Sequence, residues 1–141
     1  MPRSISATYF ILAGLLLVQF FIRAHNPTEQ PFFWDENRHM VRAADILDGA
    51  HPALNSNGKF LLYVYFAPFH PERDVALHVS RTAVALFSLL GTAAMFALAR
   101  RLFDDKVALL ATVFYMFVPF ALYYERMALA DPMAGALMVL T

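Results

Sequence analysis

The chain has 141 residues, of which 60% are hydrophobic and 16% charged, against about 25% charged in an ordinary soluble domain. This composition excludes a disordered polypeptide and argues against a water-soluble globule. The 11 basic and 11 acidic residues cancel, no Lys/Arg-rich run is present and there is no cysteine, so we expect no nucleic-acid binding and no thiolate or disulfide site.

Three apolar stretches meet or approach the length of about 20 residues that a helix needs to cross a bilayer. They cover about residues 5–22, 75–99 and 107–124. A fourth begins at Pro132, and the sequence stops at Thr141 after a rise of only about 15 Å. We therefore predict an all-α integral membrane protein, a helical bundle with three transmembrane helices and the incomplete start of a fourth over residues 132–141.

The first apolar stretch follows a short basic segment, as a secretory signal peptide does. It lacks an Ala-x-Ala-like cleavage site after it, so we expect it to remain as an anchor. Residues 1–4 and 100–106 hold four Lys/Arg in eleven positions, whereas residues 23–74 hold five in all. Because basic flanks stay in the cytoplasm, we predict a cytoplasmic N-terminus and an extracytoplasmic loop over residues 23–74.

This loop is rich in aromatic residues, so we expect it to be ordered at the membrane surface. Between Asp35, a candidate N-cap, and Gly49, a candidate stop, the apolar residues recur at helical spacing and predict a short amphipathic interfacial helix: Met40, Ala43, Ala44 and Leu47. Asn57 and Gly58 signal a turn before a second short apolar stretch, residues 61–69, which we expect to be interfacial or re-entrant.

Asp35 and Glu36 are adjacent carboxylates at the start of the predicted interfacial helix. Such a pair could accept a proton from a hydroxyl group or bind a divalent cation. The alternative is that Asp35 caps the helix and Glu36 complements its N-terminal dipole. The two roles are compatible, because a capping carboxylate is also fixed in space.

Glu125, Arg126 and Asp131 lie at the second polar junction on the predicted extracytoplasmic side. Asp131 before Pro132 is a natural helix start, and Glu125 with Arg126 suits a helix end at the interface. In a bundle, however, Asp131 and Asp35 would open onto one cleft, where separated carboxylates can serve different roles.

Arg81 lies near the start of the second apolar stretch. A guanidinium at the centre of a span costs about 2.5–3.5 kcal/mol, and less near the edge. We consider two roles, binding of a lipid headgroup phosphate and snorkelling to ordinary phospholipid.

The histidines form no i, i+4 pair with one another, so we expect no metal site from local spacing and interpret all five as loop residues: His25, His39, His51, His70 and His78. No glycine-rich phosphate loop is present.

Taken in order, four motifs resemble the N-terminal part of the integral-membrane GT-C glycosyltransferases, the group that contains protein O-mannosyltransferases and lipid A aminoarabinose transferases. The motifs are Phe33-Trp34-Asp35-Glu36 followed by Ala43–Gly49 and Pro52; Gly58–Tyr63; Arg81 through Leu90-Gly91; and Arg126 with Asp131-Pro132.

The resemblance implies inverting transfer of a sugar from a polyprenyl-phosphate-linked donor to a glycan, lipid or protein acceptor, on the outer face of a bacterial plasma membrane. It implies that Asp35, with Glu36 beside it, is the catalytic base. Arg81 and Arg126 become candidates for binding the phosphate, and Asp131 for orienting substrate. Family members are much longer, so we expect this chain to be the front end of a larger enzyme and inactive alone, with no certain cofactor.

Two other function classes remain open. A small non-enzymatic membrane scaffold or assembly subunit explains the short length directly, but not the gathering of acidic residues and arginine on one face. A transporter fragment is disfavoured, because the predicted spans lack paired Gly/Pro breaks.

Overall fold

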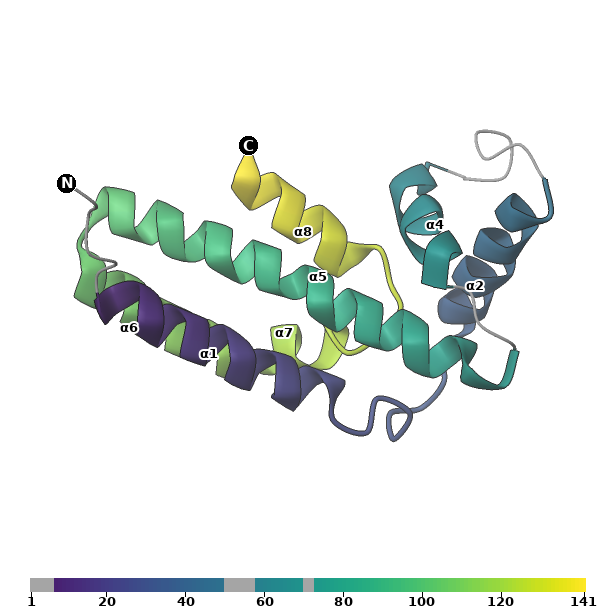
Figure 1. Ribbon diagram of the computed structural model, residues 1–141, viewed down its shortest axis with the longest axis horizontal. Coiled ribbons are helices and arrows are strands. Elements are labelled where there is room, and N and C mark those ends of the chain that lie inside the picture. Colours follow the sequence, from purple (N-terminus) through teal and green to yellow (C-terminus); the bar gives the residue numbers. More distant parts are fainter. Residues whose placement is uncertain (1–6, 50–57, 70–72) are drawn as a thin grey trace.

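The computed structural model describes residues 7–49, 58–69 and 73–141, and within these ranges the chain is helical with no strand. This confirms the all-α prediction. In chain order the elements are α1 (Ala7–Ala24), α2 (Trp34–Leu47), α4 (Phe60–Phe66), the 3₁₀ turn η1 (Ala67–Phe69), α5 (Arg73–Leu102), α6 (Asp105–Phe117), α7 (Pro119–Tyr124) and α8 (Asp131–Leu140) (Figure 1).

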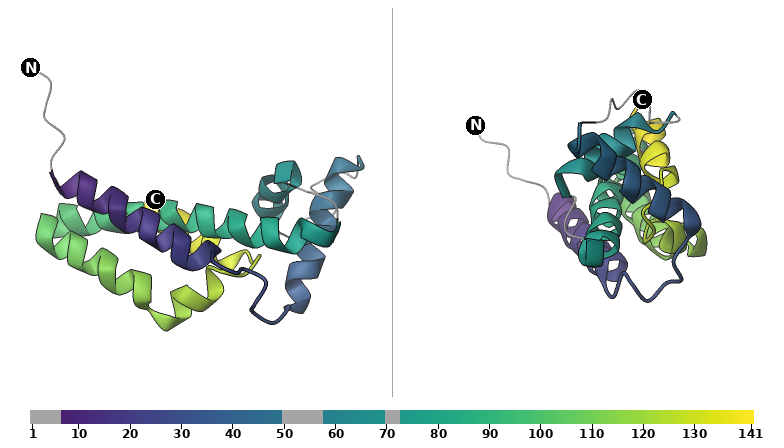
Figure 2. Two further views of the ribbon diagram at one scale, coloured as in Figure 1. Left: turned by 60° about the horizontal axis from the view of Figure 1, so that its bottom comes forward. Right: turned by 90° about the vertical axis from the view of Figure 1, so that its right-hand side faces the viewer.

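Helix α5 is the long axis of the fold, and α1, α6 and α8 lie along it (Figures 1 and 2). Its 30 residues extend about 45 Å, more than the hydrocarbon thickness of a bilayer. In the described part of the chain two helical segments are long and apolar enough to cross a membrane, Ala7–Ala24 and Val75–Leu102. Their mean hydropathies are 1.8 and 2.0, and 17% and 44% of the respective apolar windows are buried.

The predicted continuous helix over residues 107–124 is wrong. Helix α6 ends at Phe117, Val118 has φ −59° and ψ 120°, and α7 begins at Pro119. Proline lacks the N–H that an uninterrupted helix needs and disfavours helical geometry in the residue before it. The chain therefore bends at this point, as Figure 2 shows.

Polar and small residues join the long helices. The Gln19 amide on α1 donates to Thr92 Oγ1 at 2.8 Å and to Ser88 Oγ at 3.4 Å on α5, and all three side chains are buried. Helix α8 approaches α5 closely at Gly91, where an added Cβ would lie 2.8 Å from the Ala136 Cβ. Small residues permit this backbone approach, as they do between helices in membranes.

Two side-chain contacts tie the ends of the helices together. At one end Thr8 donates to Asp105 Oδ2 at 2.8 Å, which ties the start of α1 to the α5–α6 turn. At the other end Arg23 forms an ion pair with Glu125, which ties the end of α1 to the segment before α8. The N-terminal end of α1 and the α5–α6 turn therefore share one end of the molecule, opposite α2 and α4.

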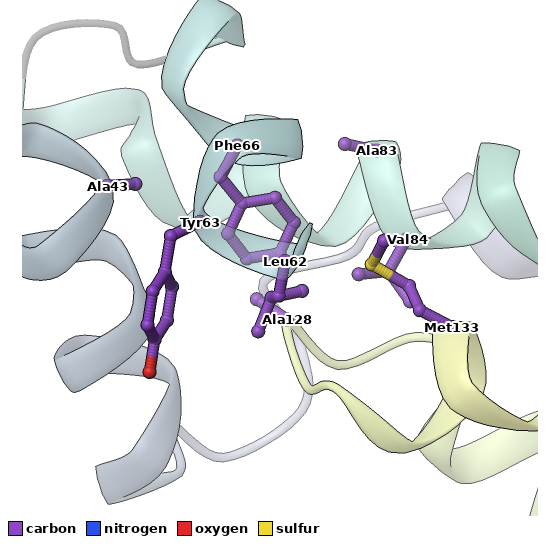
Figure 3. Close-up of a cluster of buried hydrophobic side chains, with 8 residues drawn as sticks. All are labelled: Ala43, Leu62, Tyr63, Phe66, Ala83, Val84, Ala128 and Met133. Carbon is purple, nitrogen blue, oxygen red and sulfur yellow. The ribbon is translucent and has the colours of Figure 1, made fainter. Parts of the chain in front are cut away.

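Helices α2 and α4 gather at the N-terminal end of α5 (Figure 1, Figure 2 right). The hydrophobic cluster that holds them takes residues from α2, α4, α5, α8 and the segment before α8: Ala43, Leu62, Tyr63, Phe66, Ala83, Val84, Ala128 and Met133 (Figure 3). Met40 and Ala43 of the predicted amphipathic face are buried, but Leu47 is 56% exposed. Gly49 and Gly58 have positive φ, as the stop and turn signals predicted, while Pro52 and Asn57 lie outside the described residues.

Candidate functional site

The start of helix α2 places Asp35 and Glu36 in different surroundings. The N-cap is Phe33, Asp35 is the second helical residue and Glu36 the third. Glu36 Oε2 accepts a hydrogen bond of 3.0 Å from the Phe33 backbone N–H, because a Glu at the third helical position can reach back to the N-cap. The prediction that Asp35 caps the helix is therefore wrong, and the capping interaction belongs to Glu36.

Glu36 and Arg81 form a bidentate ion pair between α2 and α5. Arg81 Nε donates to Glu36 Oε1 at 2.8 Å, and Arg81 Nη2 donates to Oε2 at 2.7 Å. Both side chains are completely buried. A parallel pair of charge-assisted bonds fixes distance and orientation together, so the pair sets how the start of α2 sits on α5.

The remaining donors of Arg81 hold the loop between α1 and α2. Nη1 donates to the carbonyls of Pro27 at 2.6 Å and Gln30 at 3.1 Å, and Nη2 donates to the carbonyl of Pro31 at 3.0 Å. All five guanidinium N–H groups are thereby used. On the other side, Glu36 Oε1 accepts from the Ala128 backbone N–H at 2.7 Å. The ion pair thus joins four segments of the chain.

Two more arginines stabilise the same end. Arg126 Nη2 donates to the carbonyls of His25 at 2.8 Å and Asn26 at 3.4 Å, so it holds the loop just before the part that Arg81 holds. Asn26 has φ 43°, a left-handed conformation that Asn tolerates. Glu125, besides its ion pair with Arg23, accepts from the Tyr115 hydroxyl at 2.5 Å.

Asp35 instead lines a small cavity of about 120 Å³ between α2 and the start of α4. The other lining residues are Arg38, His39, Arg42, Lys59 and Tyr63. Three of them lie on α2, where Arg38, His39 and Arg42 follow Asp35 by three, four and seven positions, the spacing of one helix face. A carboxylate, two guanidinium groups and an ammonium group therefore meet at one site.

His39 is the most perturbed group of this cavity. It is 2% exposed, its ring centroid lies 5.6 Å from that of Tyr63, and its Nε2 lies 3.4 Å from Lys59 Nζ. Burial and then the charge of Lys59 lower the pKa of His39 from 6.5 to about 4, against the opposing charges of Asp35 and Asp131. The imidazole is therefore uncharged at neutral pH.

The other predicted site residues take separate places. Asp131 begins α8, with Pro132 in its first turn as predicted, and it is exposed; its charge acts on His39, as that of Asp35 does. Glu36, Arg81 and Arg126 are not among the cavity-lining residues. Within the described ranges, no three His, Asp or Glu side chains form a group that could hold a metal ion.

The interpretation of all five histidines as loop residues is wrong for two of them. His39 lies in α2 and His78 in α5, while His51 and His70 fall outside the described residues. The sequence signal for His39 was its position one helical turn after Asp35, which puts both on one face of α2. Spacing among the histidines alone does not indicate it.

Comparison with known proteins finds no family, curated protein or solved structure that matches this chain.

Proposed function

We propose that this protein takes part in sugar transfer from a polyprenyl-phosphate-linked donor to a hydroxyl acceptor, as the N-terminal part of a GT-C-like glycosyltransferase. One observation carries the proposal. A half-buried carboxylate, Asp35, lines the same cavity as Arg38, Arg42 and Lys59. Such a site combines a proton acceptor with groups that bind phosphate.

The reaction assigns a separate task to each charge. The acceptor hydroxyl oxygen attacks the anomeric carbon from the face opposite the phosphate, and the anomeric C–O bond to the phosphate breaks with its electron pair on oxygen. Asp35 takes the hydroxyl proton, and the polyprenyl phosphate leaves as an anion. This leaving group needs cationic stabilisation and not a proton, so Arg38, Arg42 and Lys59 complete the site.

Glu36 and Arg81 act as positioning residues in this proposal. Arg81 was a sequence candidate for binding phosphate, yet its five N–H groups all donate to Glu36 and to loop carbonyls. We therefore assign phosphate binding to the cavity cations. Arg126 becomes a support for the loop before α2, and Asp131 a negative charge near His39.

The proposal places α1, α5 and the bent α6–α7 pair across the bacterial plasma membrane, with the N-terminus cytoplasmic. The cavity lies at the end of the bundle away from the α5–α6 turn, so it would face the extracytoplasmic side. The two apolar segments Ala7–Ala24 and Val75–Leu102 support membrane insertion by their length and composition. A donor anchored in the same bilayer would then present its phosphate at the depth of α2 and α4.

A transfer assay on the full-length protein in detergent tests the proposal. The protein is incubated with polyprenyl-phosphate donors that carry different sugars, and the released polyprenyl phosphate is measured by mass spectrometry. We expect release with at least one donor, and a raised KM in Arg38→Gln and Lys59→Gln. Arg101→Gln, an exposed change at the opposite end, is the matched control and should leave KM unchanged. Absence of release with every donor would contradict the proposal.

A further inference from the structure

His39 has a second ring nitrogen, Nδ1, for which the described residues supply no hydrogen-bond partner. Its Nδ1 is buried and without a partner among the described residues, and the side chain lines the cavity. A buried polar atom without a hydrogen-bond partner destabilises the fold, so an unpartnered Nδ1 at a cavity indicates a ligand that would accept its hydrogen bond.

The contact with Lys59 determines which nitrogen carries the proton. An ammonium group has donors only, so a hydrogen bond from Lys59 Nζ to His39 Nε2 requires an unprotonated Nε2. The neutral imidazole must then carry its proton on Nδ1. The low pKa of His39 agrees with a neutral ring.

The surroundings of His39 favour an anionic partner. Lys59, at the N-cap of α4, and Arg42 contribute positive charge, Asp35 on α2 and Asp131 on α8 contribute negative charge, and the Tyr63 ring packs on the imidazole. Among the cavity-lining residues three cations face one carboxylate. The volume of about 120 Å³ suits a small group, since one water occupies about 30 Å³ of liquid.

We propose that His39 is a ligand-binding residue whose Nδ1–H donates a hydrogen bond to a phosphate oxygen of the lipid-linked donor, while its Nε2 holds the Lys59 ammonium in the cavity. This inference rests on the proposed function. In this arrangement one imidazole accepts a hydrogen bond from the Lys59 ammonium and donates one to the phosphate.

Two substitutions separate these purposes. Asn can place an amide N–H near the position of Nδ1, whereas Gln can place an amide oxygen near that of Nε2. We expect His39→Gln to bind farnesyl phosphate at least about tenfold more weakly than wild type, and His39→Asn to stay within about threefold. Binding is measured by titration calorimetry on the full-length protein in detergent. Farnesol, which lacks the phosphate, is the control and should bind all three proteins alike.

Wild-type affinity for farnesyl phosphate in His39→Gln would overturn the inference, and so would an equal loss for farnesol. A second measurement uses the wild-type protein, so it does not depend on whether a variant folds. In protein labelled with ¹⁵N-histidine, NMR should show the Nδ1–H tautomer for His39 at pH 7 and a shift of this proton on addition of farnesyl phosphate. An Nε2–H tautomer, or no shift on binding, would contradict it.

These outcomes are distinct from failure of the proposed function. A protein that transfers no sugar but binds farnesyl phosphate through His39 contradicts the proposed reaction and supports the assignment of His39. A protein that transfers sugar and is unaffected by His39→Gln contradicts only the assignment of His39.

Discussion

Glu36 and Arg81, 45 residues apart in the sequence, meet as a completely buried bidentate ion pair with N–O distances of 2.7 and 2.8 Å. The pair fixes the first turn of α2, and Asp35, the residue before Glu36 in that turn, lines the cavity on the adjacent face. The geometry of the candidate site therefore depends on a contact that does not itself line the site.

Loss of the Glu36 carboxylate should destabilise the folded protein. We expect Glu36→Gln to lower the free energy of unfolding by about 3–5 kcal/mol, because it leaves the Arg81 guanidinium buried without its counter-charge. Thermal unfolding in detergent measures this change. Glu29→Gln, on the exposed loop before α2, is the control and should change stability by no more than about 0.5 kcal/mol. Equal effects of the two substitutions would contradict the structural role.

How far the sequence predicts this arrangement depends on the range of the interaction. Local patterns located α1, α2 and α5, and Asp131-Pro132 marked the start of α8. Pro119 is also a local signal for the bend, but the apolar residues on both sides of it led to the prediction of one continuous helix. The partners of Arg81 could not be predicted, since they come from distant segments that only the packed fold brings together.

The same distinction applies to the candidate site. Asp35 was a sequence candidate and lines the cavity, whereas Glu36 beside it points to Arg81, because side chains at adjacent helical positions face different directions. Lys59 reaches His39 only because α4 packs against α2. The contact between His39 and Lys59 is therefore not predictable from the spacing among histidines.

The Arg23–Glu125 pair should show strong coupling. We expect Arg23→Met and Glu125→Met each to destabilise the protein by about 3–5 kcal/mol, and the double variant to be much more stable than the sum of the two losses predicts. Tyr115→Phe removes only one hydrogen bond to the Glu125 carboxylate and should destabilise the protein by about 1.5–3 kcal/mol. Equilibrium unfolding of the wild type, the two single Met variants and the double variant gives the double-mutant cycle. Additive effects of the two single Met substitutions would argue against a direct ion pair.

Gly91→Ala should separate α5 from α8. The added Cβ would lie 2.8 Å from the Ala136 Cβ, so we expect a loss of about 1–3 kcal/mol, and Ala136→Gly in the same protein should recover part of it. Gly14→Ala on α1 meets nothing within 4 Å and should be neutral or stabilising by up to about 1 kcal/mol. Thermal unfolding distinguishes the two sites, and equal responses would contradict the close approach.

His39 should make stability depend on pH. Its pKa falls from 6.5 to about 4 on folding, so the unfolded chain binds more protons between these values. Its contribution is complete above pH 6.5 and is lost as the pH falls toward 4, by no more than about 3 kcal/mol at 1.36 kcal/mol per unit. Unfolding of wild type and His39→Gln across this range measures the difference in slope. A slope that persists unchanged in His39→Gln would assign the dependence to other groups.

Single-turnover sugar transfer by Asp35→Asn in the full-length protein, with donor binding measured in parallel, tests most directly whether Asp35 is the catalytic base. General base catalysis contributes about 10²–10⁴-fold, so we expect at least about a hundredfold loss of rate while donor affinity stays near that of wild type. Asp48→Asn, at the opposite end of α2, should transfer at the wild-type rate. Transfer by Asp35→Asn at the wild-type rate would contradict a catalytic role for Asp35.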